Sequence, residues 1–264
     1  MAIITLTTDF GCEDTFAAQM KGVILGIAPG VTLVDLTHNI PPQDILGGAL
    51  ALDDAADAFP PGVIHVVVVD PGVGTSRRPL AVATERETLV GPDNGVFAPL
   101  LARRRTMQAV VLANPAYRRE PVSPTFHGRD LFAPAAAYLA AGTPLHDLGP
   151  PAGGLVGLDT PQPRFAPDAI EAHVLRIDRF GNLVTDLRGE DLIRWLGSAP
   201  RKSIAFEAGS LRVQGLVLTY AAVPPGESVA YVGSSGRLEI GLHGGNAAAA
   251  SGALRGAVVR VTRR

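Results

Sequence analysis

The sequence predicts an α/β protein with two domains: an amino-terminal α/β domain built on a mainly parallel sheet, and a smaller carboxyl-terminal domain of β-strands. In residues 1–150, strand-like apolar runs alternate with helix-like periodicity, which is typical of a parallel sheet covered on both faces. In residues 169–264, helical periodicity mostly vanishes. Short strand-like runs separated by glycine or proline there indicate a small β-barrel or sandwich. Residues 151–168 are rich in proline and glycine, which predicts a linker.

The expected elements of the first domain follow from the spacing of apolar residues. Mostly apolar runs predict strands, and apolar residues at helical spacing predict helices. Pro41 and Pro42 open one helix, because proline is tolerated in a first helical turn. The expected strands are residues 3–8, 31–37, 63–69, 80–84, 88–90 and 109–113, and the expected helices are residues 13–28, 41–59 and 129–141.

The second domain is predicted to be almost entirely β-structure, since its apolar runs are short and interrupted. The expected strands are residues 169–177, 183–187, 203–207, 211–219, 228–232 and 257–262. Only residues 191–195 have a helical pattern.

Composition and charge argue against several classes of protein. With 47% apolar and 18% charged residues, the chain can bury a substantial core. A formal net charge of −2 gives no electrostatic reason to expect a nucleic acid or an anionic membrane as partner. No uncharged apolar stretch reaches membrane-spanning length, and the first residues enter a strand-like run without a basic leader segment. We therefore expect a cytoplasmic protein.

Three local features have ordinary interpretations. Cys12 is the only cysteine, so an internal disulfide and a thiolate zinc cluster are excluded, and the acidic residues after it disfavour a nucleophilic thiolate. The basic run 103–105 follows an apolar helical stretch and is interpreted as a solvated helix end. His65 lies inside the valine-rich strand 63–69 and is interpreted as a core residue.

Two aspartates follow predicted strands of the first domain. Asp9 comes after strand 3–8, and Asp70 comes after strand 63–69. Both carboxylates are expected at the edge of the sheet where open α/β folds bind their ligands. From position alone, Asp9 could equally well cap the helix that follows it.

Two further polar residues are candidates for chemistry. Arg77 follows Asp70 by seven residues and could fold back to pair with it. His127 lies between Phe126 and Gly128 in a loop-like stretch, where glycine allows a ligand to approach the backbone closely. These residues are therefore the first candidates for a reactive site.

The remaining polar clusters leave alternatives open. Asp70, Asp93 and His127 could in principle bind a metal, although no tight ligand spacing supports a metal site. Residues 178–182 form either an ordinary hairpin turn or part of a site. Residues 233–236 form either a turn or a nest of backbone amides that binds a carboxylate.

Eight short segments, taken together, point to a protein family far more specifically than any one of them does. In chain order they are Thr8-Asp9-Phe10-Gly11, Met20-Lys21-Gly22-Val23-Ile24, Thr37-His38-Asn39-Ile40-Pro41-Pro42, Val69-Asp70-Pro71-Gly72-Val73-Gly74, Gly91-Pro92-Asp93-Asn94-Gly95, Thr125-Phe126-His127-Gly128-Arg129, Asp178-Arg179-Phe180-Gly181-Asn182 and Ser235-Gly236-Arg237-Leu238-Glu239-Ile240. Over nearly the whole chain, the sequence resembles the S-adenosylmethionine (SAM) hydroxide adenosyltransferase family, the adenosine-forming SAM hydrolases. The fluorinases and chlorinases are halide-using relatives of this family.

The resemblance implies an α/β amino-terminal domain and a β-barrel carboxyl-terminal domain, assembled as a homotrimer. SAM would bind between the first domain of one subunit and the second domain of its neighbour. The family's Asp-Arg-His set falls on Asp70, Arg77 and His127. The halide enzymes lack the aspartate and the histidine, so the resemblance implies water as the nucleophile.

The chemistry of the implied reaction, in which water or hydroxide displaces methionine, indicates how the three residues act. Arg77 would stabilise hydroxide character, His127 would accept the proton, and Asp70 would hold their geometry. No metal and no cofactor are expected, because SAM is the substrate.

A larger set of residues is implied in substrate binding. Asp9 would hold the ribose hydroxyls, and Asp14 would contact the amino-acid end. Asp178 and Ser234 would bind the methionine amine and carboxylate, whereas Phe180 and Asn182 would face adenine. The full implied set is Asp9, Asp14, Phe126, Gly128, Asp178, Phe180, Asn182, Ser234, Glu239 and Leu242. At Gln43 the sequence departs from the halide enzymes, which carry a tryptophan there.

Three other functions remain alternatives to SAM hydrolysis. A halide-using adenosyltransferase would form a 5′-halo-adenosine. A metal-dependent hydrolase would lose activity on chelation. A non-catalytic sensor would bind adenosine or SAM without releasing methionine.

Overall fold

The computed structural model describes residues 2–263, which form two compact units. The first unit ends at Asp159 and the second begins at Thr160. This boundary falls inside the stretch 151–168 that the sequence predicts to be a linker.

The first part of that stretch packs onto the first unit. Pro151 forms a β-bridge with Val110. Arg78 donates hydrogen bonds to the carbonyl oxygens of Gly153 and Gly154, at 2.9 and 2.8 Å. The arginine thereby satisfies backbone acceptors that have no partner in a strand. The connection between the two units is therefore shorter than the predicted linker.

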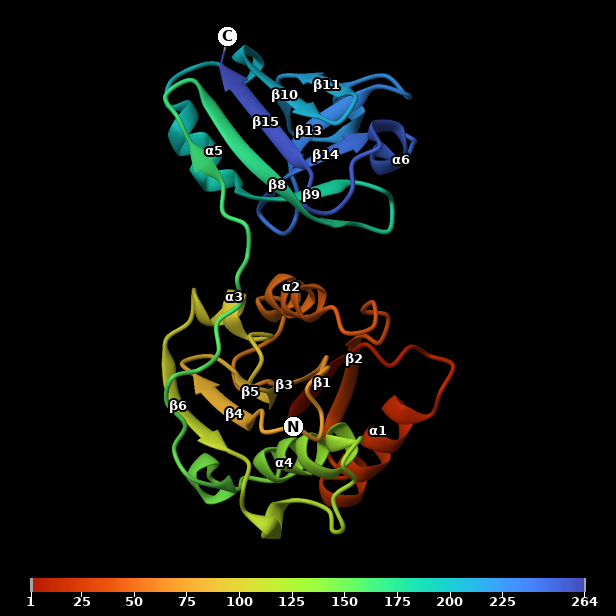
Figure 1. Cartoon of the computed structure of the whole chain (residues 1–264), viewed down its shortest axis with the longest axis vertical. Helices are drawn as coiled ribbons and strands as arrows, with labels where there is room; N and C mark the ends of the chain where they lie inside the picture. Colours follow the sequence, from red (N-terminus) through yellow and green to blue (C-terminus); the bar gives the residue numbers. More distant parts are fainter. Residues whose placement is uncertain (1, 264) are drawn as a thin grey trace. The chain divides into compact units, whose positions relative to one another are not determined.

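The first unit is built on a six-stranded sheet with the strand order β2-β1-β3-β5-β4-β6 (Figure 1). Its strands are β1 (Ile3–Thr8), β2 (Thr32–Thr37), β3 (Ile64–Val68), β4 (Pro79–Thr84), β5 (Thr88–Pro92) and β6 (Thr106–Val111). The β2, β1, β3 and β5 strands pair in parallel, and β4 pairs antiparallel with both β5 and β6. A short hairpin joins β4 to β5, which permits the antiparallel pairing. The predicted mainly parallel sheet is confirmed.

Helices cover both faces of this sheet. On one face α1 and α4 share an apolar cluster with the strands, through Met20 and Ile24 of α1 and an alanine-rich run of α4. On the other face α2 and α3 form a second cluster, which includes Leu52 and Leu100 (Figure 1). The helices are α1 (Phe16–Ile27), α2 (Ile45–Ala56), α3 (Ala98–Leu101) and α4 (Ala133–Ala140), with short turns η1 (Pro115–Tyr117), η2 (Gly128–Phe132) and η3 (Leu145–Leu148).

Helix starts differ from the prediction for local reasons. The α2 helix begins after the proline pair, because Asp44 caps it and accepts a hydrogen bond from the Gly47 amide at 3.0 Å. The α1 helix begins at Phe16, three residues later than expected. The helix expected over 129–141 is divided into the π-helical turn η2 and α4.

The second unit is a nearly closed barrel. Hydrogen-bonded neighbours follow the path β11-β10-β15-β8-β9-β14-β13-β12, with β7 paired to β8. The Ser228 hydroxyl on β13 donates to the Arg212 carbonyl on β11 at 3.2 Å, so distant strands of the path approach each other. The strands are β7 (Arg164–Phe165), β8 (Ala169–Ile177), β9 (Leu183–Arg188), β10 (Ile204–Ala208), β11 (Leu211–Gln214), β12 (Leu216–Val217), β13 (Ser228–Val232), β14 (Arg237–Leu242) and β15 (Val258–Arg263). The prediction of a carboxyl-terminal β-barrel is confirmed.

Several details of the second unit differ from the prediction, among them the strands β7 and β14, which were not expected. The strand expected over 211–219 is divided into β11 and β12, because Gly215 between them adopts a φ of +82°. A short helix, α6 (Ala247–Ser251), was not expected, and Asn246 caps it by accepting a bond from the Ala249 amide at 2.8 Å. The expected helix at 191–195 is present as α5 (Gly189–Leu196), and the remaining turns are η4 (Arg201–Ser203) and η5 (Tyr220–Ala222).

The basic run 103–105 is not simply a solvated helix end. Arg103 donates to Asp53 and Asp57, each at 2.6 Å. Arg104 pairs with Asp57 and donates to Glu87 at 3.1 Å. Asp53 and Glu87 are buried carboxylates that require charged partners, which spacing in the sequence does not reveal.

Burial agrees with the core interpretation of His65, which is fully buried. Its Nδ1 lies 2.7 Å from the Thr5 hydroxyl, and Phe59 packs edge-on against its ring. Within residues 2–263, no helix combines the length and the apolar character needed to cross a bilayer.

Candidate functional site

The loop after β3 carries Asp70 and Arg77. The side chains are 4% and 9% exposed, so the pair is almost withdrawn from solvent. Arg77 Nε donates to both carboxylate oxygens of Asp70, at 2.9 and 3.0 Å, and its Nη2 also bonds Oδ2. Such a forked, charge-assisted contact fixes the plane of the guanidinium. The predicted pairing of the two residues is present.

The same guanidinium contacts His127, fifty residues further along the chain. Arg77 Nη2 lies 2.8 Å from His127 Nδ1. Arg77 also stacks on Phe132, with its Cζ 5.3 Å from the ring centroid. Two loops meet here, because Gly74, at a φ of +77°, packs against the Pro124 carbonyl. A Cβ at Gly74 would lie 2.5 Å from that oxygen. The structure therefore brings together the three residues Asp70, Arg77 and His127.

The contact with Arg77 sets the tautomer of His127. A guanidinium has only donors, so His127 Nδ1 must accept this bond and the ring proton must lie on Nε2. Burial lowers the pKa of His127, and the positive charge of Arg77 lowers it further, against the opposing carboxylates of Asp70 and Asp130. The ring is therefore neutral at neutral pH and offers an N–H donor at Nε2.

One donor of the cluster has no partner. Among the buried side-chain atoms of residues 2–263, Arg77 Nη1 is one of a few that make no hydrogen bond. A buried guanidinium nitrogen without an acceptor is unfavourable, so it marks a place where a polar ligand or water would be stabilised.

Asp130 supports the loop that carries His127. It is buried, and its carboxylate accepts bonds from Arg129 at 2.7 and 2.8 Å and from the Ser123 amide at 2.9 Å. Burial raises the pKa of Asp130, but these hydrogen bonds outweigh it and lower the pKa below its ordinary value. Asp130 remains ionised and holds both ends of this loop.

Asp9 lies beside the loop that precedes α2. Its Oδ2 accepts the Gln43 amide at 2.8 Å, and Gln43 has a φ of +67°, a value that among residues 2–263 is otherwise positive only at glycines. Asp9 therefore does not cap α1, whose N-cap is Thr15. Asp14 is exposed.

Aromatic rings surround Gly128. Phe126 is buried and makes edge contacts with Phe10 and Phe16, at centroid distances of 5.9 and 5.2 Å. A Cβ on Gly128 would lie only 3.1 Å from the Met20 sulfur, so the glycine provides room for this packing.

In the second unit, Asp178 organises its own turn. Its Oδ1 accepts the amides of Phe180 and Asn182, at 2.9 and 2.8 Å, and its Oδ2 accepts the Asn182 side-chain amide at 2.7 Å. The hairpin interpretation of residues 178–182 is therefore correct as local structure. Phe180 is 76% exposed, a large apolar side chain projecting from this turn.

The 233–236 turn precedes β14. Ser234 is exposed, whereas the hydroxyl of Ser235 is buried without a hydrogen-bond partner among the described residues. Glu239 is buried and accepts a bond from the Tyr231 hydroxyl at 2.6 Å, and Leu242 is half-buried. Sequence reasoning missed Ser235, although it lies in the same serine pair as Ser234.

A metal held by Asp70, Asp93 and His127 was one alternative, but Asp93 is engaged elsewhere. Asp93 is paired with Arg78 and accepts the Val156 amide at 2.9 Å, so it serves the attachment of residues 153–156. Within residues 2–263, no three histidine, cysteine or acidic side chains are grouped as a metal site requires.

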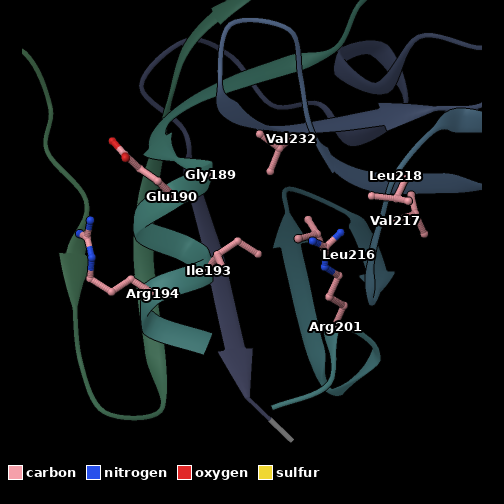
Figure 2. Close-up of a pocket in the computed structure, with 9 residues that line it drawn as sticks. All are labelled: Gly189, Glu190, Ile193, Arg194, Arg201, Leu216, Val217, Leu218 and Val232. Atoms are coloured by element: carbon pink, nitrogen blue, oxygen red, sulfur yellow. The ribbon is translucent and has the colours of Figure 1, made fainter. Parts of the chain in front are cut away.

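A hollow of about 500 Å³ lies elsewhere in the second unit, beside α5. Figure 2 shows Ile193 pointing from α5 towards β12, while Arg194 points away. The residues that line this hollow are mainly apolar, and none of the predicted site residues is among them.

Models of known protein families match both units of the chain. Residues 4–149 match the amino-terminal domain of SAM hydroxide adenosyltransferase, and residues 172–260 match its carboxyl-terminal domain. The chain belongs to the SAM hydroxide adenosyltransferase family. The family resemblance inferred from the eight segments is confirmed.

Relatives of this SAM hydroxide adenosyltransferase family member include named enzymes. The (R)-S-adenosyl-L-methionine hydrolase of Thermus thermophilus is 41% identical, over 99% of this chain and 100% of the relative. That of Salinispora tropica is 40% identical over 98% and 97%. A fluorinase from an Actinoplanes species is 28% identical, over 90% of each chain.

Solved structures show the same fold as this family member. A protein described as uncharacterized and conserved, from Thermotoga maritima, matches with a TM-score of 0.92 and 27% identity, over the full length of both chains. A conserved hypothetical protein from Thermus thermophilus matches with a TM-score of 0.79 and 38% identity, over 99% of this chain and all of that one.

Proposed function

We propose that this protein is an adenosine-forming SAM hydrolase that converts SAM and water to adenosine and L-methionine. The observation that carries the proposal is the cluster of Asp70, Arg77 and His127, in which one buried guanidinium nitrogen has no partner. It occurs in a chain about 40% identical to enzymes named (R)-S-adenosyl-L-methionine hydrolase.

The chemistry requires a nucleophile more than an acid. The water oxygen forms a bond to C5′ of the ribose, the C5′–S bond breaks, and its electron pair stays on sulfur. Methionine leaves as a neutral thioether, so its departure needs no proton. Free water has a pKa near about 15.7, so the main task of the site is to favour hydroxide. Preorganised N–H donors in a buried site stabilise such an anion.

The hydrogen bond between Arg77 and His127 changes the role first expected for the histidine. The basic nitrogen Nδ1 already accepts from Arg77, and Nε2 carries the ring proton. We therefore propose that His127 donates a hydrogen bond to hydroxide, and that the proton of the nucleophilic water passes to solvent before attack. Asp70 fixes the guanidinium plane, and Arg77 supplies the charge.

Exchange of His127 separates the donor role from the base role. His127→Gln keeps an N–H donor without a basic nitrogen, and we expect kcat within about tenfold of the wild type. His127→Glu supplies a base without a donor, and we expect kcat to fall at least about a hundredfold. Steady-state kinetics of both variants measure the difference. The reverse order of activities would assign His127 as the base.

The remaining predicted residues complete the proposal. Asp9, Asp14, Phe126 and Gly128 would contact the ribose and amino-acid parts of SAM from the first unit. From the second unit, Phe180, Asn182 and Leu242 would contact adenine, and Asp178, Ser234 and Glu239 would serve the methionine end. We extend the proposal to a homotrimer of cytoplasmic location that uses no cofactor, as the family resemblance implies.

The decisive experiment supplies SAM in oxygen-18 water. Because the relatives are named for the (R) form, both sulfonium epimers are offered separately. We expect equimolar adenosine and methionine, with the label in the adenosine 5′-hydroxyl. Saturable binding without methionine release would instead identify a sensor. A 5′-halo-adenosine formed in chloride, bromide or fluoride would identify a halide-using enzyme.

A further inference from the structure

Two of the eight family segments, residues 20–24 and 37–42, carry polar side chains that the proposed reaction does not use. In the structure, these side chains are joined through β2. Lys21 on α1 donates from Nζ to Oδ2 of Asp35, on β2, at 2.6 Å. The other oxygen of Asp35, Oδ1, lies 3.1 Å from Nε2 of His38, which follows β2. A chain of polar contacts therefore leads from α1 to His38.

His38 is the buried end of this chain. Its side chain is 8% exposed, whereas those of Lys21 and Asp35 are 32% and 40% exposed. Burial raises the pKa of Asp35, but the contacts with Lys21 and His38 outweigh it and lower the pKa below its ordinary value. An ionised carboxylate only accepts, so the ring nitrogen that faces it, Nε2, carries a proton. Nε2 makes no well-directed hydrogen bond, so its attraction to Asp35 is chiefly electrostatic.

The other ring nitrogen of His38 contacts Thr8, at the end of β1. The Thr8 hydroxyl lies 2.8 Å from Nδ1, and both side chains are buried. With the proton on Nε2, the Nδ1 atom of the neutral ring accepts, so the hydroxyl donates to it. The hydroxyl oxygen in turn accepts the amide of Phe10 at 3.3 Å. Thr8 therefore links His38 to the backbone on the far side of Asp9.

This link joins the two loops that hold the Asp9 carboxylate. The Gly11 amide donates to the His38 carbonyl at 2.8 Å, so the loops after β1 and β2 are also tied through their backbones. Oδ2 of Asp9 accepts the Gln43 amide from the second loop at 2.8 Å. Oδ1 of Asp9 accepts no hydrogen bond from residues 2–263, so this oxygen remains for a ligand.

We propose that His38 is a positioning residue, which acts through the Thr8 hydroxyl to aim the Asp9 carboxylate at the two hydroxyls of a ribose. The inference rests on the proposed function, in which Asp9 holds those hydroxyls. A carboxylate that accepts from two neighbouring hydroxyls must keep its plane and its position, so a small shift of the loop costs one of the bonds. The His38 side chain therefore sets how strongly the site prefers a ribose to a 2′-deoxyribose.

The test compares adenosine with 2′-deoxyadenosine, which lacks one of these hydroxyls. Calorimetry measures both dissociation constants for the wild type, His38→Leu and His38→Asn. Leucine cannot accept from Thr8, so we expect the preference for adenosine to fall about tenfold, the loss of one oriented hydrogen bond. The Oδ1 atom of asparagine can accept in place of Nδ1, so His38→Asn should keep the preference within about twofold. His146→Leu removes an exposed histidine of the same unit and is the matched control, with no change expected.

Two further variants show whether His38 acts through Asp9. Thr8→Val removes the hydroxyl with little change of shape, so it should lose the preference as His38→Leu does. It also carries the test if His38→Leu does not fold. Asp9→Asn alters the ribose contact itself. In that background, His38→Leu should change the preference by less than about twofold, because residues that act through one contact are not additive.

Each outcome has a distinct meaning. An unchanged preference in folded His38→Leu and Thr8→Val, even with both nucleosides bound more weakly, would give His38 a merely structural role and overturn the inference. A full effect of His38→Leu on top of Asp9→Asn would also overturn it, because His38 would then act through another group. Either result leaves SAM hydrolysis intact. A wild-type protein that binds neither nucleoside and does not cleave SAM would overturn the proposed function itself.

Discussion

Replacement of Arg77 by alanine is expected to lower kcat for SAM hydrolysis at least about a hundredfold, the usual effect of removing a preorganised charged donor. The side chain bonds both oxygens of Asp70 and Nδ1 of His127, and it carries the unpartnered Nη1. Its loss would leave Asp70 buried and unpaired and would free His127 to rotate. Turnover with saturating SAM measures the effect.

Two controls make this result specific. Arg77→Lys keeps a positive charge but cannot form the forked contact, so we expect kcat to remain well below that of the wild type. Arg118→Ala removes a partly exposed surface arginine paired with Glu120, and kcat should be unchanged. Adenosine affinity should be largely kept in all three variants. Full turnover by Arg77→Ala would remove this residue from the mechanism.

Acidification from pH 7 to pH 4.5 is expected to reduce the free energy of unfolding by about 2.5 kcal/mol through His65 alone. Burial lowers the pKa of His65 to about 4 in the folded protein, against an ordinary value of 6.5. Between these two values the unfolded chain binds the proton and the folded protein does not. Stability therefore falls as pH falls through this window.

Urea unfolding at pH 7, 5.5 and 4.5 measures this contribution. His65→Gln removes the titration, so we expect its stability to depend less on pH over the same range, whatever its absolute value. Three carboxyl groups with shifted pKa values titrate mainly below this pH window. They are Asp35, Asp57 and Asp130. In each, burial raises the pKa but hydrogen bonds outweigh it, so the pKa lies below 3.8. Parallel pH profiles of wild type and His65→Gln would contradict the assignment.

Most strands and their alternation with helices could be predicted from the sequence, because burial imposes a pattern on each strand separately; β7 and β14 could not. The run 169–177 is present as β8 and 228–232 as β13, with the expected bounds. Helix starts could not be predicted as well. Whether Pro41 or Asp44 begins α2 depends on which backbone geometry the preceding loop adopts.

Some residues of the candidate site could likewise be predicted from the sequence, and others could not. Asp70 could be placed at the end of a strand, and its partner Arg77 lies close in sequence. The proximity of His127 came from the family resemblance, since no local pattern links it to Arg77 across fifty residues. Tyr220 and Tyr231 gave no signal, because their hydrogen bonds to each other and to Glu239 form only when η5, β13 and β14 pack together.

By itself, the sequence determined a two-part architecture, an α/β unit followed by a unit of β-strands, and the identity of the polar residues that follow its strands. These properties depend on apolar periodicity and on turn residues, which act over a few neighbours along the chain. Only the tertiary structure decided which nitrogen of His127 carries the proton, and which donor of Arg77 is left without a partner. Those properties depend on hydrogen bonds between loops far apart in sequence, whose direction is set by where the donors and acceptors meet.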